Sequence, residues 1–117
     1  MTIPKTPSAE KYREALLALE SRMTETRRKL LSVHYQFPDR RATMTQISNE
    51  MGWAKHSAGN LHYGALAKLI GDQVGFHFGT VDLNSICEFN EDKEPAEHWV
   101  LTLRPELAEA IESLGWT

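Results

Sequence analysis

Asn60 and Tyr63 have the side chains best suited to contact a nucleic acid. An asparagine amide can pair with adenine through two hydrogen bonds, and a tyrosine can reach a phosphate or stack on a base. In a helix, a rotation of about 100° per residue places both on one side, together with Gly64 and Ala67. The spacing therefore predicts an outward helix face that contacts base edges and phosphates.

Basic and polar residues surround this face along the chain. Lys55, His56 and Ser57 lie at the start of the same predicted helix, where the N–H groups and the helix dipole favour phosphate. Arg40 and Arg41, in the preceding loop, are candidate clamps on the DNA backbone. The alternative is that these polar side chains simply face water. The predicted DNA-contacting set comprises Arg40, Arg41, Thr45, Lys55, His56, Ser57, Asn60, Tyr63 and Lys68.

A helix-turn-helix between Thr45 and Leu69 would position these side chains. Thr45 is a candidate N-cap, Gly52 stands where a left-handed residue usually closes a helix, and Ser57 is a second candidate cap. The second helix of such a pair can lie in the major groove of DNA. Apolar residues at spacings of three and four predict its buried stripe: Ala58, Leu61, Ala65 and Leu69.

Two glycines inside the second helix need an explanation. Gly59 and Gly64 each cost about 1 kcal/mol of helix stability relative to alanine. Close approach of another backbone, from protein or from DNA, would explain both, and we expect helix packing to be the cause.

The whole chain predicts a mainly α-helical fold with a β-hairpin, an α+β fold of the winged helix-turn-helix type. Ala42–Met44 is a candidate short strand, and Pro105 occupies the favoured first position of the last helix. The hairpin would be the wing, although its tip is acidic where a wing that touches DNA is normally basic. We expect one domain over residues 1–117, with helices over 8–23 and 24–37, the helix-turn-helix over 45–70, the hairpin over 82–103 and a C-terminal helix over 105–114.

Charge is unevenly distributed along the chain. The formal net charge is −3, but residues 24–71 carry seven basic and three acidic side chains, whereas residues 72–117 carry two basic and ten acidic ones. A local positive face can attract phosphate in a negatively charged protein, because salt screens charges beyond about 10 Å. The predicted helix-turn-helix thus lies in the basic part of the chain.

The residue patterns do not favour catalysis or metal binding. A single cysteine and histidines without zinc-site spacing argue against the common structural zinc sites, and we expect no cofactor. His34 and His62 lie near apolar faces and are expected in the core with hydrogen-bond partners. Cys87 and His98 lie on the two predicted hairpin strands, where they would suit a thiolate nucleophile, but a buried strand cysteine explains Cys87 better. Phosphate loops, paired catalytic carboxylates and nucleophile elbows are absent from the sequence, so we do not expect an enzyme.

Composition is that of an ordinary globular protein. The 117 residues suffice for one domain with a modest core, and no apolar run approaches the length of a membrane span. The N-terminal sequence lacks the apolar stretch of a secretory signal, and the single cysteine fits a reducing cytoplasm. We therefore predict a cytoplasmic protein that does not enter membranes.

Two motifs resemble a small bacterial domain family of poorly defined function, whose members occur alone or joined to HNH-type nuclease domains. The first is the A-x-N-L-x-Y-G-x-L core at Ala58, Asn60, Leu61, Tyr63, Gly64 and Leu66. The second is the W-x-x-x-x-R-P-E-L-x-x-A-I-x-x-L-G-W ending at Trp99, Arg104, Pro105, Glu106, Leu107, Ala110, Ile111, Leu114, Gly115 and Trp116. The resemblance spans roughly residues 28–117 and implies a context of mobile elements or restriction, in which an accessory DNA-binding module would be natural. This chain has no histidine–asparagine–histidine nuclease segment, so the resemblance implies no cleavage and supplies no catalytic residue.

Two functions of different classes follow from these observations. The first is a winged-helix module that binds double-stranded DNA, as a regulator or a targeting module. The second is a protein-binding module, like the phage-encoded anti-CRISPR inhibitors of bacterial defence, whose acidic C-terminal half occupies the basic surface of a partner. The residues predicted for that second role are Glu91, Asp92, Glu94 and Glu97. Apolar residues at both ends would serve either the core or the seam of a homodimer: Tyr12, Leu16, Leu19 and Trp116.

Overall fold

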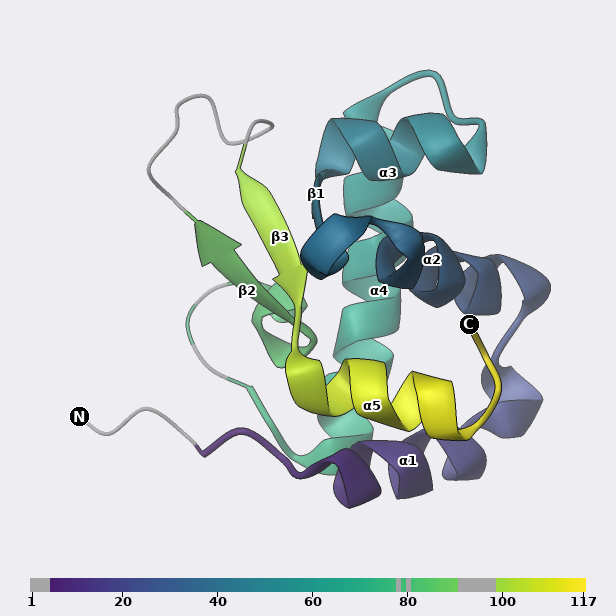
Figure 1. Ribbon diagram of the computed structural model, residues 1–117, viewed down its shortest axis with the longest axis vertical. Coiled ribbons are helices and arrows are strands. Elements are labelled where there is room, and N and C mark those ends of the chain that lie inside the picture. The colour runs from purple at the N-terminus through teal and green to yellow at the C-terminus, as the bar shows by residue number, and fades with distance from the viewer. Residues whose placement is uncertain (1–4, 78, 80, 91–98) are drawn as a thin grey trace.

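The computed structural model describes residues 5–77, 79, 81–90 and 99–117. In these ranges the chain is mainly helical and carries a small three-stranded antiparallel sheet (Figure 1), which confirms the α+β class. The α-helices are α1 (Ala9–Ala18), α2 (Glu25–Gln36), α3 (Met44–Met51), α4 (His56–Val74) and α5 (Pro105–Ser113). The strands are β1 (Arg41–Thr43), β2 (Cys87–Asn90) and β3 (Val100–Leu103), and short 3-10 helices are η1 (Glu20–Arg22), η2 (Pro38–Arg40) and η3 (Asp82–Ser85).

Side-chain caps determine where the first two helices begin. The Ser8 hydroxyl accepts a hydrogen bond from the Lys11 N–H, and the Thr24 hydroxyl accepts one from the Arg27 N–H, each at 3.2 Å. Each cap satisfies one of the N–H groups that a helix leaves free at its start. The first helix ends at Ala18 and continues only as η1, so the α-helix predicted over 8–23 is shorter than expected.

Thr43, and not Thr45, caps α3. Its hydroxyl accepts a hydrogen bond from the Gln46 N–H at 3.2 Å, and the Gln46 side chain accepts one from the Thr43 N–H at 2.8 Å. This reciprocal pair satisfies two N–H groups at once, which a cap at Thr45 would not do. The strand predicted at 42–44 lies one residue earlier, and the helix follows it directly.

β3 is the central strand of the sheet, and its neighbours on either side, β1 and β2, are both antiparallel to it. Leu101 pairs with Ala42 on one side and with Phe89 on the other. The hairpin predicted over 82–103 is confirmed in part, because β2 and β3 pair as expected. Its first residues form η3 instead of strand.

The core is built around α4. In Figure 1, α3 packs on α4 near its upper end and α1 packs on it near its lower end, whereas α5 lies alongside α1. Tyr12 is fully buried in this core and donates a hydrogen bond from its hydroxyl to the Ser85 carbonyl oxygen at 2.6 Å. The apolar side chains considered for a homodimer seam, namely Tyr12, Leu16, Leu19 and Trp116, are all buried within the single chain.

The buried face of α4 differs from the predicted one. It consists of Gly59, Tyr63, Leu66, Ala67, Ile70 and Gly71. The predicted stripe (Ala58, Leu61, Ala65 and Leu69) is rotated about the helix axis by roughly one residue position from this buried face. Leu61, which was predicted to be buried, is 71% exposed. The error has a physical cause: apolar residues occur all around α4, and two of the positions that face the core are glycines, which carry no hydrophobic signal.

The two mid-helix glycines of α4 have different surroundings. A Cβ at Gly59 would collide with the Ser48 hydroxyl and lie 2.7 Å from the Met44 sulfur, so Gly59 permits the close packing of α3 on α4. A Cβ at Gly64 would have no atom within 4 Å. The packing explanation is therefore confirmed for Gly59 and wrong for Gly64.

Candidate nucleic-acid interface

α3 and α4 are joined by a short turn that begins at Gly52. Gly52 has a φ of 82°, in the left-handed region, as predicted for a residue that closes a helix. The Trp53 N–H donates to the Ser48 carbonyl oxygen at 2.9 Å, which ties the turn back to α3. The turn fixes the position from which α4 starts at His56.

The N-terminus of α4 is basic and lacks a side-chain cap. Its N-cap residue is Lys55, whose side chain makes no capping hydrogen bond, and no acidic residue occurs in its first turn. Ser57, predicted as the cap, lies inside the helix instead. By contrast, α1, α2 and α5 each carry a glutamate in their first turn: Glu10, Glu25 and Glu106. The helix dipole and the exposed ammonium group of Lys55 make the start of α4 electropositive.

The solvent-facing side of α4 starts with small and apolar residues. Ser57, Leu61 and Ala65 are exposed, and Asn60 is exposed at the edge nearer the sheet. Lys68 follows along the helix and lies 3.1 Å from the Asp72 carboxylate. That lysine, together with His77, holds the pKa of the Asp72 carboxyl below its usual value. The charge of Lys68 is thus partly compensated within the helix, whereas Lys55 has no acidic residue in the first turn of its helix.

Tyr63 does not face solvent, and its predicted contact with DNA is wrong. Its side chain is fully buried, and its hydroxyl lies 2.6 Å from Nδ1 of His34 on α2. The other ring nitrogen, Nε2, lies 3.0 Å from the Leu101 carbonyl oxygen, which can only accept. Nε2 therefore carries the proton, and the Tyr63 hydroxyl donates to Nδ1. One neutral imidazole thus connects α2, α4 and β3.

Burial keeps this histidine neutral. Desolvation lowers the pKa of His34 to about 4, although the hydrogen bond to the Leu101 carbonyl acts in the opposite direction. The core position predicted for His34 is confirmed. His62, for which the same was predicted, is exposed instead, and its ring lies against that of Trp53 with centroids 4.8 Å apart.

Cys87 lies beside this buried network, with its sulfur 4.0 Å from Nδ1 of His34. The cysteine is fully buried, as predicted for a strand position, and desolvation raises the pKa of its thiol to about 12. A protonated, buried thiol is a poor nucleophile at neutral pH. His98, considered as its partner, lies outside the described residues.

The structure does not bring Arg40 to the start of α4. Its guanidinium lies over the ring of Tyr35, 3.8 Å from the centroid, and it lines a hollow with Glu109 and Glu112 of α5. Arg41, the next residue, is exposed on β1 and pairs with Thr102. Arg41 differs from Arg40 in this respect. Its side chain is exposed, and in the described part of the chain its guanidinium does not stack on an aromatic ring. Thr45 is exposed in the first turn of α3.

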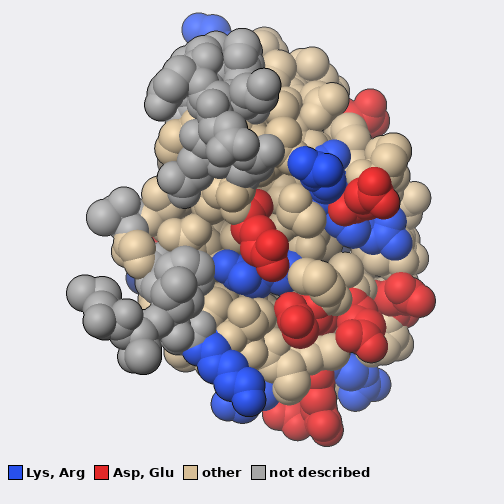
Figure 2. All heavy atoms as spheres, turned by 60° about the vertical axis from the view of Figure 1, so that its left-hand side comes forward, with Lys and Arg blue, Asp and Glu red and all other residues tan. Residues whose placement is uncertain are grey.

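The acidic residues of the alternative site, namely Glu91, Asp92, Glu94 and Glu97, lie outside the described residues. Figure 2 shows one face of the molecule, on which basic and acidic side chains lie intermingled. This face therefore does not present a continuous basic surface to a polyanion.

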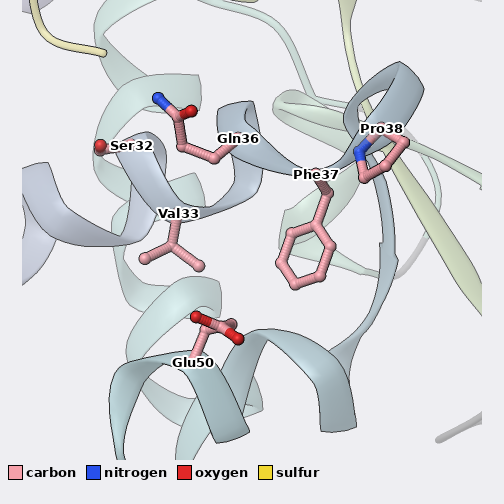
Figure 3. Close-up of a pocket in the computed structure, with 6 residues that line it drawn as sticks. All are labelled: Ser32, Val33, Gln36, Phe37, Pro38 and Glu50. Carbon is pink, nitrogen blue, oxygen red and sulfur yellow. The ribbon is translucent and has the colours of Figure 1, made fainter.

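A groove between α2 and α3 offers a different chemistry, which the sequence did not indicate. It has a volume of about 330 Å³, and Val33 and Phe37 form an apolar wall opposite the Glu50 carboxylate (Figure 3). A carboxylate opposite an apolar wall disfavours phosphate. We therefore place the candidate nucleic-acid interface on α4 and not in this groove.

Comparisons with known proteins provide no further evidence about the site: no family model, no curated protein and no solved structure matches the chain. The family resemblance of the two motifs therefore stays a prediction. In the described ranges, no helix has the length and apolar character needed to cross a bilayer. The same ranges contain no group of three His, Cys, Asp or Glu side chains arranged to hold a metal ion.

Proposed function

We propose that the protein is a DNA-binding module of the winged-helix type. The order of elements supports this: a helix, a first strand, two packed helices and then two paired strands, with the last strand in the centre of the sheet. In such a domain the second helix of the pair, here α4, enters the major groove and the hairpin lies beside it.

The N-terminal half of α4 is the single observation that carries the proposal. Lys55 and the backbone N–H groups at the start of α4 would contact a backbone phosphate. Asn60, exposed one turn further, can hydrogen-bond to a base edge, and Leu61, at 71%, is the most exposed large hydrophobic side chain in the described part of the chain. An apolar side chain there suits the methyl group of thymine. Arg41 and Thr45 are additional candidates for backbone contacts, whereas Tyr63 no longer belongs to the set.

The salt dependence of DNA binding tests the phosphate contact. Binding of a random-sequence duplex, followed by fluorescence anisotropy, should weaken steeply as salt rises. Lys55→Ala should reduce the slope of log K against log salt by about 0.9, because one fewer counterion is released. Lys11→Ala is the matched control, since Lys11 is an exposed lysine on α1, and it should leave the slope unchanged. An absence of binding at low salt contradicts the proposal.

A charge introduced at Leu61 tests the docking of the helix face. Leu61→Glu should weaken duplex binding by about tenfold or more, because a carboxylate would then face a polyanion inside a groove. The matched control is Leu17→Glu, which places the same charge at a leucine that is 42% exposed on α1. Equal losses for the two variants would show a general charge effect and contradict docking through α4.

A second candidate function is binding of a basic protein partner. The observation that favours it is the composition of α5, whose charged side chains are all acidic: Glu106, Glu109 and Glu112. For this function, Glu109→Lys should abolish capture of a partner while Leu61→Glu leaves capture intact. The opposite pattern would support α4 as the contact surface.

A further inference from the structure

A cleft of about 180 Å³ lies between the start of α4 and the inner face of the sheet. His56 and Asn60 of α4 line one side of it. Its other walls are apolar and consist of Met44, Val81, Leu83, Phe89, Trp99 and Leu101. A few polar groups beside apolar and aromatic walls are typical of small-molecule sites.

This cleft is the open end of the hydrophobic core. Along the inner face of the sheet, the pair of Cys87 and Leu103 is fully covered, whereas Phe89 and Trp99, further from the core, are only half-buried. The two aromatic rings meet edge to face, with centroids 6.1 Å apart and an interplanar angle of 76°. Val81 at the same cleft is 41% exposed. A ligand with an apolar face would cover apolar surface that these described residues expose.

Polar groups at the cleft indicate the kind of ligand. His56 lines the cleft with an imidazole, whose ring nitrogens can donate or accept a hydrogen bond. The Asn60 amide offers a donor and an acceptor side by side. Together these groups suit a flat ring that carries both donors and acceptors on its edge.

The volume limits the size of that ring. A cavity of about 150 Å³ in another protein admits one benzene molecule. The cleft here, at about 180 Å³, has room for one six-membered ring but not for a large cofactor. We propose that the cleft binds a single pyrimidine-type heteroaromatic ring, with Phe89 and Trp99 against the ring and the Asn60 amide on its edge.

Two sources could supply such a ring. One is a free pyrimidine base or nucleoside that acts as an effector. The other is a base unstacked from DNA at the α4 surface, which costs least where the base is mismatched. Binding of a free base or nucleoside does not require that the protein binds DNA. Binding of a base unstacked from DNA does, and so it rests on the proposed function.

Titration with free cytosine and uracil tests the site without DNA. The readout is the indole N–H resonance of Trp99, assigned by its loss in Trp99→Phe. We expect a saturable shift, and Asn60→Leu should weaken binding by about tenfold through loss of the paired hydrogen bonds. The matched control is Asn49→Leu, on an exposed asparagine of α3, which should leave the affinity unchanged. Thermal unfolding of each variant must match that of the parent protein.

Three outcomes overturn the proposal: no shift up to the solubility limit of the bases, no change on Asn60→Leu, or an equal affinity for benzene, which would indicate an apolar cavity only. A duplex with one mismatched pyrrolo-cytosine then distinguishes the sources. A rise in its fluorescence that Asn60→Leu abolishes assigns the ring to DNA. Binding of the free base without that rise assigns it to an effector. The salt titration of an ordinary duplex reports separately on DNA binding.

Discussion

Gly59→Ala is expected to destabilise the protein by about 1 to 3 kcal/mol, although alanine is the better helix former. The added Cβ would collide with the Ser48 hydroxyl and lie 2.7 Å from the Met44 sulfur, so these buried side chains of α3 would have to shift or α3 would have to move away from α4. Urea unfolding, followed by circular dichroism, measures the change. The destabilisation should appear as a lower midpoint with an unchanged slope.

Gly64→Ala is the matched control in the same helix. Its added Cβ has no atom within 4 Å, so only the intrinsic preference for alanine remains, and stability should rise by about 1 kcal/mol. The two variants share the same chemical change, and their difference isolates the packing of α3 on α4. Equal effects on stability would mean that the close approach at Gly59 does not constrain the fold.

The second large effect is a loss of stability in acid that depends on His34. The folded protein holds the pKa of this imidazole at about 4, below its ordinary value of 6.5. Between these two pH values the unfolded chain binds a proton that the folded protein excludes. The free energy of unfolding should therefore fall as pH drops from 6.5 towards 4, by about 3 kcal/mol in total from this group. Well above pH 6.5 the imidazole is neutral in both states and contributes no pH dependence.

His34→Gln separates this contribution from that of the carboxyl groups. Glutamine does not titrate but can still donate and accept hydrogen bonds. The variant should be less stable than the parent protein at pH 7, and the gap should narrow as pH approaches 4. His62→Gln controls for the loss of an imidazole from the exposed surface. A gap that stays constant between pH 7 and pH 4 would contradict the role assigned to His34.

Local signals predicted the order of the elements well. Gly52 marked the end of α3, and Pro105 opened α5. Glycine readily adopts a positive φ and proline fixes φ, so both signals act through local backbone geometry and need no tertiary contact to interpret. The capping residue of α3 was misplaced because Thr43 and Thr45 offer the same hydroxyl. Only the observed start of α3 at Met44, directly after β1, shows that Thr43 is the capping residue.

The orientation of α4 could not be predicted in the same way. Leu61 is exposed and Tyr63 is buried, which reverses the usual preference of the two side chains. Tyr63 is buried because its hydroxyl meets a histidine 29 positions earlier, and such a long-range partner leaves no trace in helical spacing. Arg40 likewise lies away from the predicted site, with its guanidinium over the ring of Tyr35 on α2. The candidate interface therefore keeps Lys55, Ser57 and Asn60 but not its tyrosine.

The His34 imidazole, which connects α2 with α4 and β3, also bears on the stability of truncated forms of the protein. A fragment that ended before β2 would keep His34 and Tyr63 but lose the carbonyl of Leu101, the acceptor for the proton on Nε2. It would also lose α5, which packs along α1. We therefore expect truncation between the helices and the strands to yield an unfolded peptide and not a smaller domain.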